Sequence, residues 1–213
     1  MSETPRETGD GCVSEVFGRE ALAADVRFLV EQVETHHPEP YNGYNGRVAI
    51  HKRLERIIRD LPERATAEEF YRDAADLVAS LEDAHSRLHP PDDGDGDDRR
   101  LPLSFRVIGD GLYVDSVADR SLTDLLGARL RSVEGVDLAT LTARVASLNG
   151  VENNYHGLWW TGGTVAAWNP LARLLDIEIP TTVELTVERS GGTTRTVALS
   201  PVADDADPVA ELD

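Results

Sequence analysis

The stretch PPDDGDGDDRR, residues 90–100, separates two parts of the chain whose apolar residues follow different periods. Before it, apolar residues recur at the three- and four-residue spacing of amphipathic helices. After it, they alternate or run together as they do in strands. The stretch itself is too polar to pack and is rich in turn formers. We therefore predict two different modules joined by an acidic linker over residues 91–100.

Three amphipathic stripes fill the first part of the chain. The first ends before Pro38, because proline disfavours helix in the residue that precedes it. The second begins after the turn-forming stretch PEPYNGYNG. The third follows Thr66, which together with Glu69 has the spacing of a helix-capping box. These stripes predict a three-helix bundle over residues 19–90, after a flexible N-terminus of residues 1–18.

Strand patterns dominate the second part. LPLSFRVI and GLYVDSV flank a glycine turn, and a short strand before Glu134 and Gly135 is followed by a helix that begins near Leu138. A last hairpin turns at Gly191-Gly192. We predict an α+β fold in which residues 101–200 form a β-rich domain. The acidic, aperiodic residues 201–213 are expected to be a disordered tail.

The charge of the chain restricts its partners. Its 213 residues include 39 Asp and Glu against 21 Lys and Arg, which gives a formal charge of −18, and Lys52 is its only lysine. Such a chain repels phosphate backbones and anionic membranes, so neither nucleic acid nor a membrane is an expected partner. An acid-rich, lysine-poor composition is typical of proteins in very salty cytoplasm, and we expect a halophilic source.

Other features limit the location and chemistry of the protein. Cys12 is the single cysteine and cannot form an internal disulfide. Neither a signal peptide nor a membrane-spanning pattern is recognisable, which predicts a soluble cytoplasmic protein. No phosphate loop and no GxSxG motif occurs. The sequence therefore predicts no cofactor.

The stretch LEDAHSRLHPP contains the main chemical candidates, His85 and His89. At a four-residue spacing, two histidines on one helix can share a metal ion. Pro90 and Pro91 oppose a helix here, and no acid stands in a recognisable third-ligand pattern, so we expect no metal. The other interpretation is a histidine at a helix end, where carbonyl oxygens favour cations.

Taken in order, the helices ending in LEDAHSRLHPP, then LPLSFRVIGDGLYVDSV, then LLGARLRSVEGVDL resemble the N-terminal half of tail-specific, or C-terminal processing, serine peptidases and their tricorn-like relatives. In that family a helical region ends in a Gly-His-Thr-like signature and a PDZ-like domain follows. Ala84-His85-Ser86 takes the place of the signature here, with alanine for glycine, and HHPEPYNGY resembles the His-Pro ending of the family's first helix. The resemblance implies that residues 101–200 are PDZ-like.

The resemblance also implies site residues. By position, His85 would be the histidine that assists the nucleophilic serine in tricorn-like members, a role that suits imidazole near neutral pH. The family's nucleophile domain has no counterpart after Leu199, and Lys52 matches no catalytic lysine. PDZ-like domains bind chain ends by strand addition. That places the expected peptide-binding residues in LLGARL, namely Leu125, Leu126, Gly127 and Leu130.

The function expected from the sequence is therefore a non-catalytic, substrate-recognition half of a tail-specific peptidase. Such a half would bind protein or peptide C-termini or dock to a separate catalytic chain. One alternative is a self-assembling interaction protein, or a truncated remnant, in which tryptophans of LWWTGGTVAAW form contacts with other copies rather than a peptide pocket. Another is a hydrolase that pairs His85 with a serine such as Ser86 or Ser104.

Overall fold

The computed structural model describes residues 15–41, 46–91, 99–177 and 181–212. The chain divides into two compact units, each with its own apolar core. The N-terminal unit comprises residues 1–96 together with 147–150, and the C-terminal unit comprises residues 97–146 and 151–213. The central stretch of the predicted linker, residues 92–98, lies outside the described residues.

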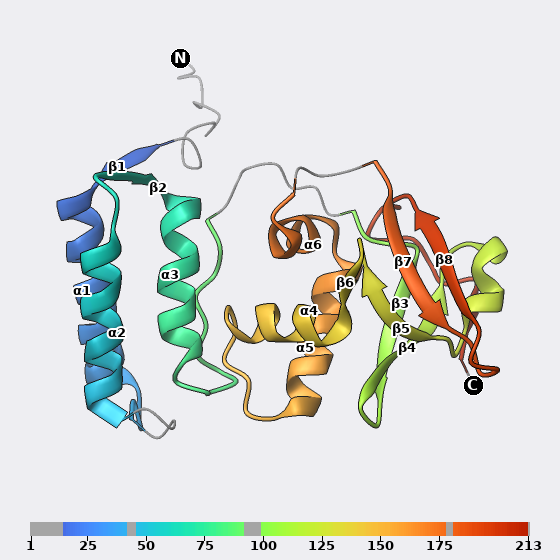
Figure 1. The fold of residues 1–213 in the computed structure, drawn as a ribbon, viewed down its shortest axis with the longest axis horizontal. Helices are drawn as coiled ribbons and strands as arrows, with labels where there is room; N and C mark the ends of the chain where they lie inside the picture. Colours follow the sequence, from blue (N-terminus) through green and yellow to red (C-terminus); the bar gives the residue numbers. More distant parts are fainter. Residues whose placement is uncertain (1–14, 42–45, 92–98, 178–180, 213) are drawn as a thin grey trace, which may run out of the picture. The chain divides into compact units, whose positions relative to one another are not determined.

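Three helices build the N-terminal unit (Figure 1). They are α1 (Arg19–His36), α2 (Gly46–Asp60) and α3 (Ala67–Ala79). Each helix buries one apolar stripe, and the stripes of the three helices meet in one core that includes Val26, Leu54 and Leu77. The helices lie where the sequence periods predicted them, because a stripe repeating every three to four residues faces one side of a helix.

A short antiparallel ribbon also belongs to this unit. Its strands are β1 (Val16–Gly18) and β2 (Arg64–Thr66). The strand β1 falls within residues 1–18, where we expected a flexible terminus, so that expectation fails for this strand. The predicted capping box is confirmed: Thr66 accepts a hydrogen bond from the Glu69 backbone, and the Glu69 side chain accepts one from the backbone of Thr66.

An antiparallel sheet forms the centre of the C-terminal unit, with strand order β3-β4-β5-β7-β8. The strands are β3 (Leu103–Ile108), β4 (Gly111–Val117), β5 (Arg129–Val133), β7 (Val183–Glu188) and β8 (Thr194–Leu199). Two short strands add to it, β6 (Val136–Asp137) beside β5 and β9 (Ala210–Glu211) beside β4. The 3-10 helix η1 (Arg120–Leu125) connects β4 to β5. Both hairpins predicted from the sequence are present, and the fold is of the mixed α+β kind.

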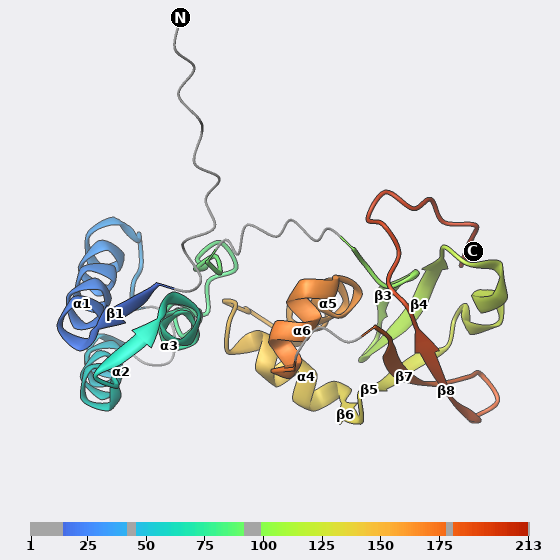
Figure 2. The same ribbon diagram turned by 90° about the horizontal axis from the view of Figure 1, so that it is seen from above.

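Helices lie on one side of this sheet (Figure 1 and Figure 2). They are α4 (Leu138–Ala146), α5 (Asn154–Ala166) and α6 (Trp168–Leu175). The sequence predicted α4, but it gave no helix for LWWTGGTVAAW. Gly162 explains part of the close packing, since a β-carbon there would lie 3.3 Å from the Leu112 side chain and 3.4 Å from Phe105 Cβ. Trp168 is fully buried in the same core.

The end of the chain differs from the predicted disordered tail of residues 201–213. Val202 exchanges backbone hydrogen bonds with Arg100, and β9 pairs with the end of β4. Leu212 donates a further backbone hydrogen bond to Asp115. Backbone pairing needs no apolar periodicity, so the acidic composition of this segment misled the prediction. Within the described part of the chain, no helix has both the length and the apolar character needed to cross a bilayer.

Candidate functional site

The loop that follows α3 holds the histidine singled out by the sequence. The helix ends at Ala79, and Glu82 adopts a left-handed backbone conformation with φ of 54° that turns the chain sharply. His85 and His89 both lie beyond this turn, outside any helix, and both are exposed. Their four-residue spacing therefore does not place them on one helix face, as a shared metal ion would require.

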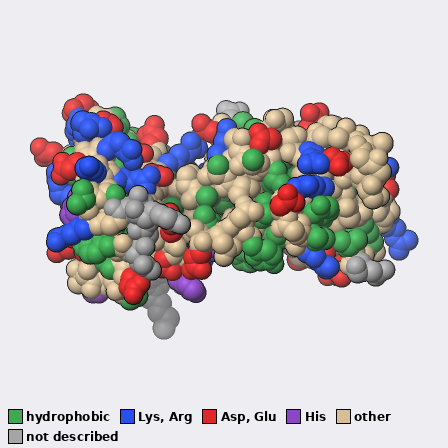
Figure 3. Space-filling model, turned by 60° about the horizontal axis from the view of Figure 1, so that its bottom comes forward, with side chains coloured by type: hydrophobic (Ala, Val, Ile, Leu, Met, Phe, Trp, Pro, Cys, Tyr) green, Lys and Arg blue, Asp and Glu red, His purple; other side chains and the backbone are tan. Residues whose placement is uncertain are grey.

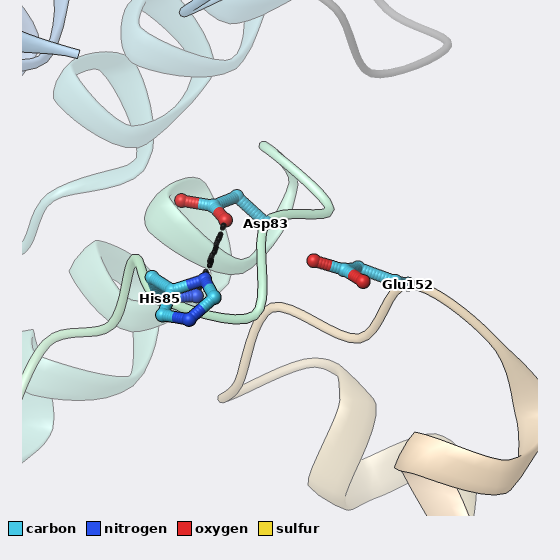
Figure 4. Close-up of side chains that lie close together, drawn as sticks. All are labelled: Asp83, His85 and Glu152. Carbon is cyan, nitrogen blue, oxygen red and sulfur yellow. Dashed lines mark hydrogen bonds and ion pairs between the residues drawn. The ribbon is translucent and has the colours of Figure 1, made fainter. Parts of the chain in front are cut away.

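Asp83 is the centre of a polar cluster in this loop. Its carboxylate accepts a hydrogen bond of 2.6 Å from Ser86 Oγ and lies 3.0 Å from His37 Nε2. The same carboxylate accepts the backbone N–H of His85 at 3.2 Å, and His85 Nδ1 lies 3.6 Å away (Figure 4). Glu152, also drawn in Figure 4, belongs to the C-terminal unit.

These contacts stabilise the charged form of Asp83. The hydrogen bond from Ser86 contributes most and that from His37 adds to it, whereas partial burial opposes them. Together they lower the pKa of Asp83 from 3.8 to about 2. His37 belongs to the HHPEP stretch at the end of α1, so the two histidine motifs quoted from the sequence meet at one carboxylate.

The cluster does not have the geometry of a serine hydrolase. In such a site a histidine accepts the serine proton while an acid holds the opposite ring nitrogen. Here Ser86 and His37 both bond the acid, and the side chain of His85 is 92% exposed. The second candidate serine, Ser104, shares a hydrogen bond of 2.7 Å with Ser116 on the neighbouring strand. The arrangement can hold the loop in shape but supplies no activated nucleophile.

The segment LLGARL is not free to hold a peptide end. The side chains of Leu125 and Leu130 are fully buried in the core. The backbone N–H groups of Leu126, Gly127 and Ala128 donate to carbonyls within the unit, those of Thr123, Val114 and Leu125 respectively. Because a carboxylate-binding loop needs free backbone donors, the geometry gives no support to a peptide site at Leu125, Leu126, Gly127 and Leu130.

A strand edge without a partner among the described residues lies elsewhere in the same unit, at β8, which is one end of the sheet. Arg189 N donates to Thr193 O at the top of the β7-β8 hairpin. Hydrogen-bonded and non-bonded pairs alternate along an antiparallel ladder, so the backbone groups of residues 195, 197 and 199 bond β7. Thr194, Thr196 and Ala198 therefore direct their N–H and C=O groups away from the sheet.

Sequence reasoning missed this edge. Val197 and Leu199 are buried, while Thr194, Thr196 and Ala198 are exposed, so the strand presents a polar face with its open backbone. The turn at Gly191-Gly192 gave the hairpin register, from which the outward residues follow. What the sequence did not show is that β8 would be the last strand of the sheet, since strand order depends on long-range pairing.

The other exposed feature of this unit is aromatic. Tyr155 and Trp159 lie one turn apart on α5 and are 61% and 56% exposed. The Trp159 ring stacks on His156 and meets Trp160 edge-on, with centroids 6.1 and 5.2 Å apart. Trp160 packs against the core. The tryptophan stretch thus divides into core residues, Trp160 and Trp168, and one exposed ring.

Comparison with solved structures finds a similar fold in CPAF, a tail-specific protease of Chlamydia. Mature CPAF matches with a TM-score of 0.59 and 17% identity, over 90% of this chain and 36% of that chain. The chain shares a fold with part of CPAF. CPAF in complex with lactacystin gives a TM-score of 0.58 at 17% identity, over 86% of this chain and 35% of that chain.

A serine-to-alanine variant of CPAF also matches, with a TM-score of 0.58 and 16% identity over 91% of this chain. The chain spans about a third of the length of these CPAF structures. No family model matches the sequence, and no curated protein does. At 16–17% identity the likeness shows a shared fold, and it does not single out tricorn-like members.

Proposed function

We propose that this chain is a non-catalytic half of a tail-specific-peptidase-like protein, and that its C-terminal unit binds an extended polypeptide tail by strand addition to β8. The fold shared with one third of CPAF supports the first part. The open edge of β8, with three outward-facing residues, supports the second and carries the proposal. Backbone hydrogen bonds would give the affinity, as in other complexes that add a strand to a sheet.

Strand edges are commonly protected against pairing by charge, bulges or covering loops. Along β8, the outward positions Thr194, Thr196 and Ala198 carry no charge, and the β7-β8 ladder runs through all six residues without a register shift. Arg195, the one charged residue of the strand, is held in an ion pair with Asp124. A regular, uncharged edge of this kind is suited to accept a partner strand.

The test is to replace Thr196 with proline. Thr196→Pro removes one outward N–H but no backbone hydrogen bond to β7, and proline is tolerated on an edge strand whose N–H faces solvent. It also removes the 3.0 Å hydrogen bond between the hydroxyls of Thr196 and Thr186, as any residue without a hydroxyl does. We expect binding of a labelled peptide with a free C-terminus to weaken about tenfold, because a ladder hydrogen bond is lost and the edge is obstructed. Fluorescence anisotropy measures the affinity.

Thr196→Val is the matched control, since it changes the same side chain and keeps the N–H. It should bind like wild type, and circular dichroism should show both variants folded. Equal affinity of folded Thr196→Pro and wild type would contradict binding at β8. A peptide with an amidated C-terminus distinguishes two modes of binding. Amidation weakens binding if the site recognises a chain end, and it has no effect if the site accepts any extended segment.

One observation favours a second candidate function, self-association. Tyr155 and Trp159 expose aromatic surface on α5, and exposed aromatic patches mark contact sites more often than single apolar residues do. Sedimentation of the wild-type chain over a range of concentrations distinguishes this candidate, because a self-assembling chain shifts to higher mass without any peptide.

A further inference from the structure

The helix α2 is positively charged, whereas the chain as a whole is strongly negative. It carries five of the 21 Lys and Arg residues, including the single lysine, against two acids, Glu55 and Asp60. Five positive and two negative side chains give the helix a net charge of +3 in a chain of net charge −18. A local field of opposite sign attracts an oppositely charged partner to one place on a surface.

The exposed side of α2 concentrates this charge. Its residues Val48, Lys52, Arg56 and Arg59 are exposed and follow one another at three- or four-residue spacing, so they share a helix face. A shallow hollow of about 510 Å³ lies along this face. Four basic side chains line it together with Val48, His51 and one acid, Glu55. Figure 3 shows Lys and Arg side chains, in blue, among the hydrophobic and acidic side chains on the surface of the N-terminal unit.

The basic residues of α2 differ in their partners. Arg47 lies 3.3 Å from Glu34, Arg53 pairs with Asp76 at 3.1 Å, and Arg59, on the face just described, pairs with Asp60 at 2.8 Å. Among the described residues, Lys52 forms no hydrogen bond or ion pair. Arg56 forms none either, but its charge acts on the nearby carboxylates of Asp60 and Asp73.

The same face offers an apolar contact. Val48 is 67% exposed at one end of the hollow. Long basic side chains cover apolar surface with their methylene stems while their charged ends stay in water. We propose that this face of α2 binds an acidic polypeptide segment, whose carboxylates pair with Lys52 and Arg56 and whose apolar side chain contacts Val48.

A polypeptide fits better than nucleic acid. A nucleic acid presents a continuous row of phosphates, which would extend beyond one short helix onto a strongly acidic surface. An acidic peptide needs only a few carboxylates over the length of α2. The site lies on the N-terminal unit and does not depend on the β8 edge, so either can fail without the other.

The experiment uses the full chain and a fluorescently labelled peptide of glutamates around one leucine. The test variant is Lys52→Glu, which reverses one charge and places a glutamate four residues before Arg56, a pair that favours the helix. The control is Arg120→Glu, an exposed basic residue of the C-terminal unit whose replacement changes the net charge equally.

We expect Lys52→Glu to weaken binding about fivefold and Arg120→Glu to leave it nearly unchanged. A peptide with glutamine in place of glutamate should bind weakly to all three proteins, and added salt should weaken the acidic peptide. Equal losses in the two variants would overturn the proposal, because the effect would then follow net charge. Self-association of the wild type that Lys52→Glu abolishes would overturn it in favour of a second copy on α2.

Discussion

Asp83 joins the end of α1 to the loop after α3 through one carboxylate. Ser86 and His37 donate to it, and the backbone of His85 adds a third contact. A histidine and a serine beside an acid are the parts of a hydrolase, but the acid occupies the central place that a histidine needs for catalysis. At the scale of single residues, the contacts of Asp83 therefore hold the signature-like loop against the end of α1.

The lowered pKa of Asp83 gives a pH-dependent stability. Since its pKa falls from 3.8 to about 2 on folding, the contribution is present above pH 4 and is lost as the pH falls toward 2. The side chain is 28% exposed, so we expect Asp83→Asn to cost about 1–2 kcal/mol of unfolding free energy at neutral pH, less than the full shift implies.

Urea unfolding of wild type and Asp83→Asn from pH 7 down to pH 3 measures this difference. It should shrink as the pH falls below about 4, because the wild-type carboxylate then begins to lose its advantage over the unfolded chain. Asp25→Asn, at an exposed position on α1, controls for removing one negative charge. A difference that stays constant over the whole range would contradict the role given to Asp83.

Elements with a strong period were predictable from the sequence, and elements held by contacts distant in the chain were not. The stripes of α1 to α3, the Thr66 cap and the two hairpins follow from local chemistry. The helix α5 has no clear apolar stripe in its sequence. Its core-facing residues include the small Gly162 beside Leu158, and its outward-facing residues include the large, apolar Trp159. Likewise, β9 forms only because β4 offers it backbone partners.

The neighbouring glycines of α5 allow a test of its packing on the sheet. A side chain at Gly162 would press on Leu112 and Phe105, whereas one at Gly163 meets nothing within 4 Å. We expect Gly162→Leu to lower the unfolding free energy by about 1–3 kcal/mol through overpacking. Gly163→Leu should be neutral or stabilising, because leucine favours a helix over glycine.

Chemical denaturation of the two variants compares the same substitution at adjacent positions. If both lose stability equally, the close approach of α5 to β3 and β4 is not what requires a glycine at position 162.

The candidate site shows a similar dependence on distant contacts. His85 was found from the sequence, but its exposure was not, and the buried environment of Leu125 and Leu130 appears only once η1 and β5 pack into the core.

At the scale of the whole molecule, the chain combines a fold found in a third of CPAF with a polar cluster at Asp83 that does not have the geometry of a serine hydrolase. The N-terminal unit contributes a basic helix face, and the C-terminal unit contributes an open strand edge. The two proposed binding surfaces belong to different units, so each can be tested without the other. Its strong negative charge keeps such surfaces distinct from the rest of the molecule.

The most direct test uses NMR to measure amide hydrogen exchange in β8, with and without a bound C-terminal peptide. Cleavage of the peptide is monitored in the same sample. In the free protein, the amides of Thr194, Thr196 and Ala198 should exchange faster than those of Arg195, Val197 and Leu199, which bond β7. The account predicts that peptide slows exchange at the three outward amides and stays uncleaved. Binding that leaves those amides unprotected, or steady cleavage of the peptide, would contradict it.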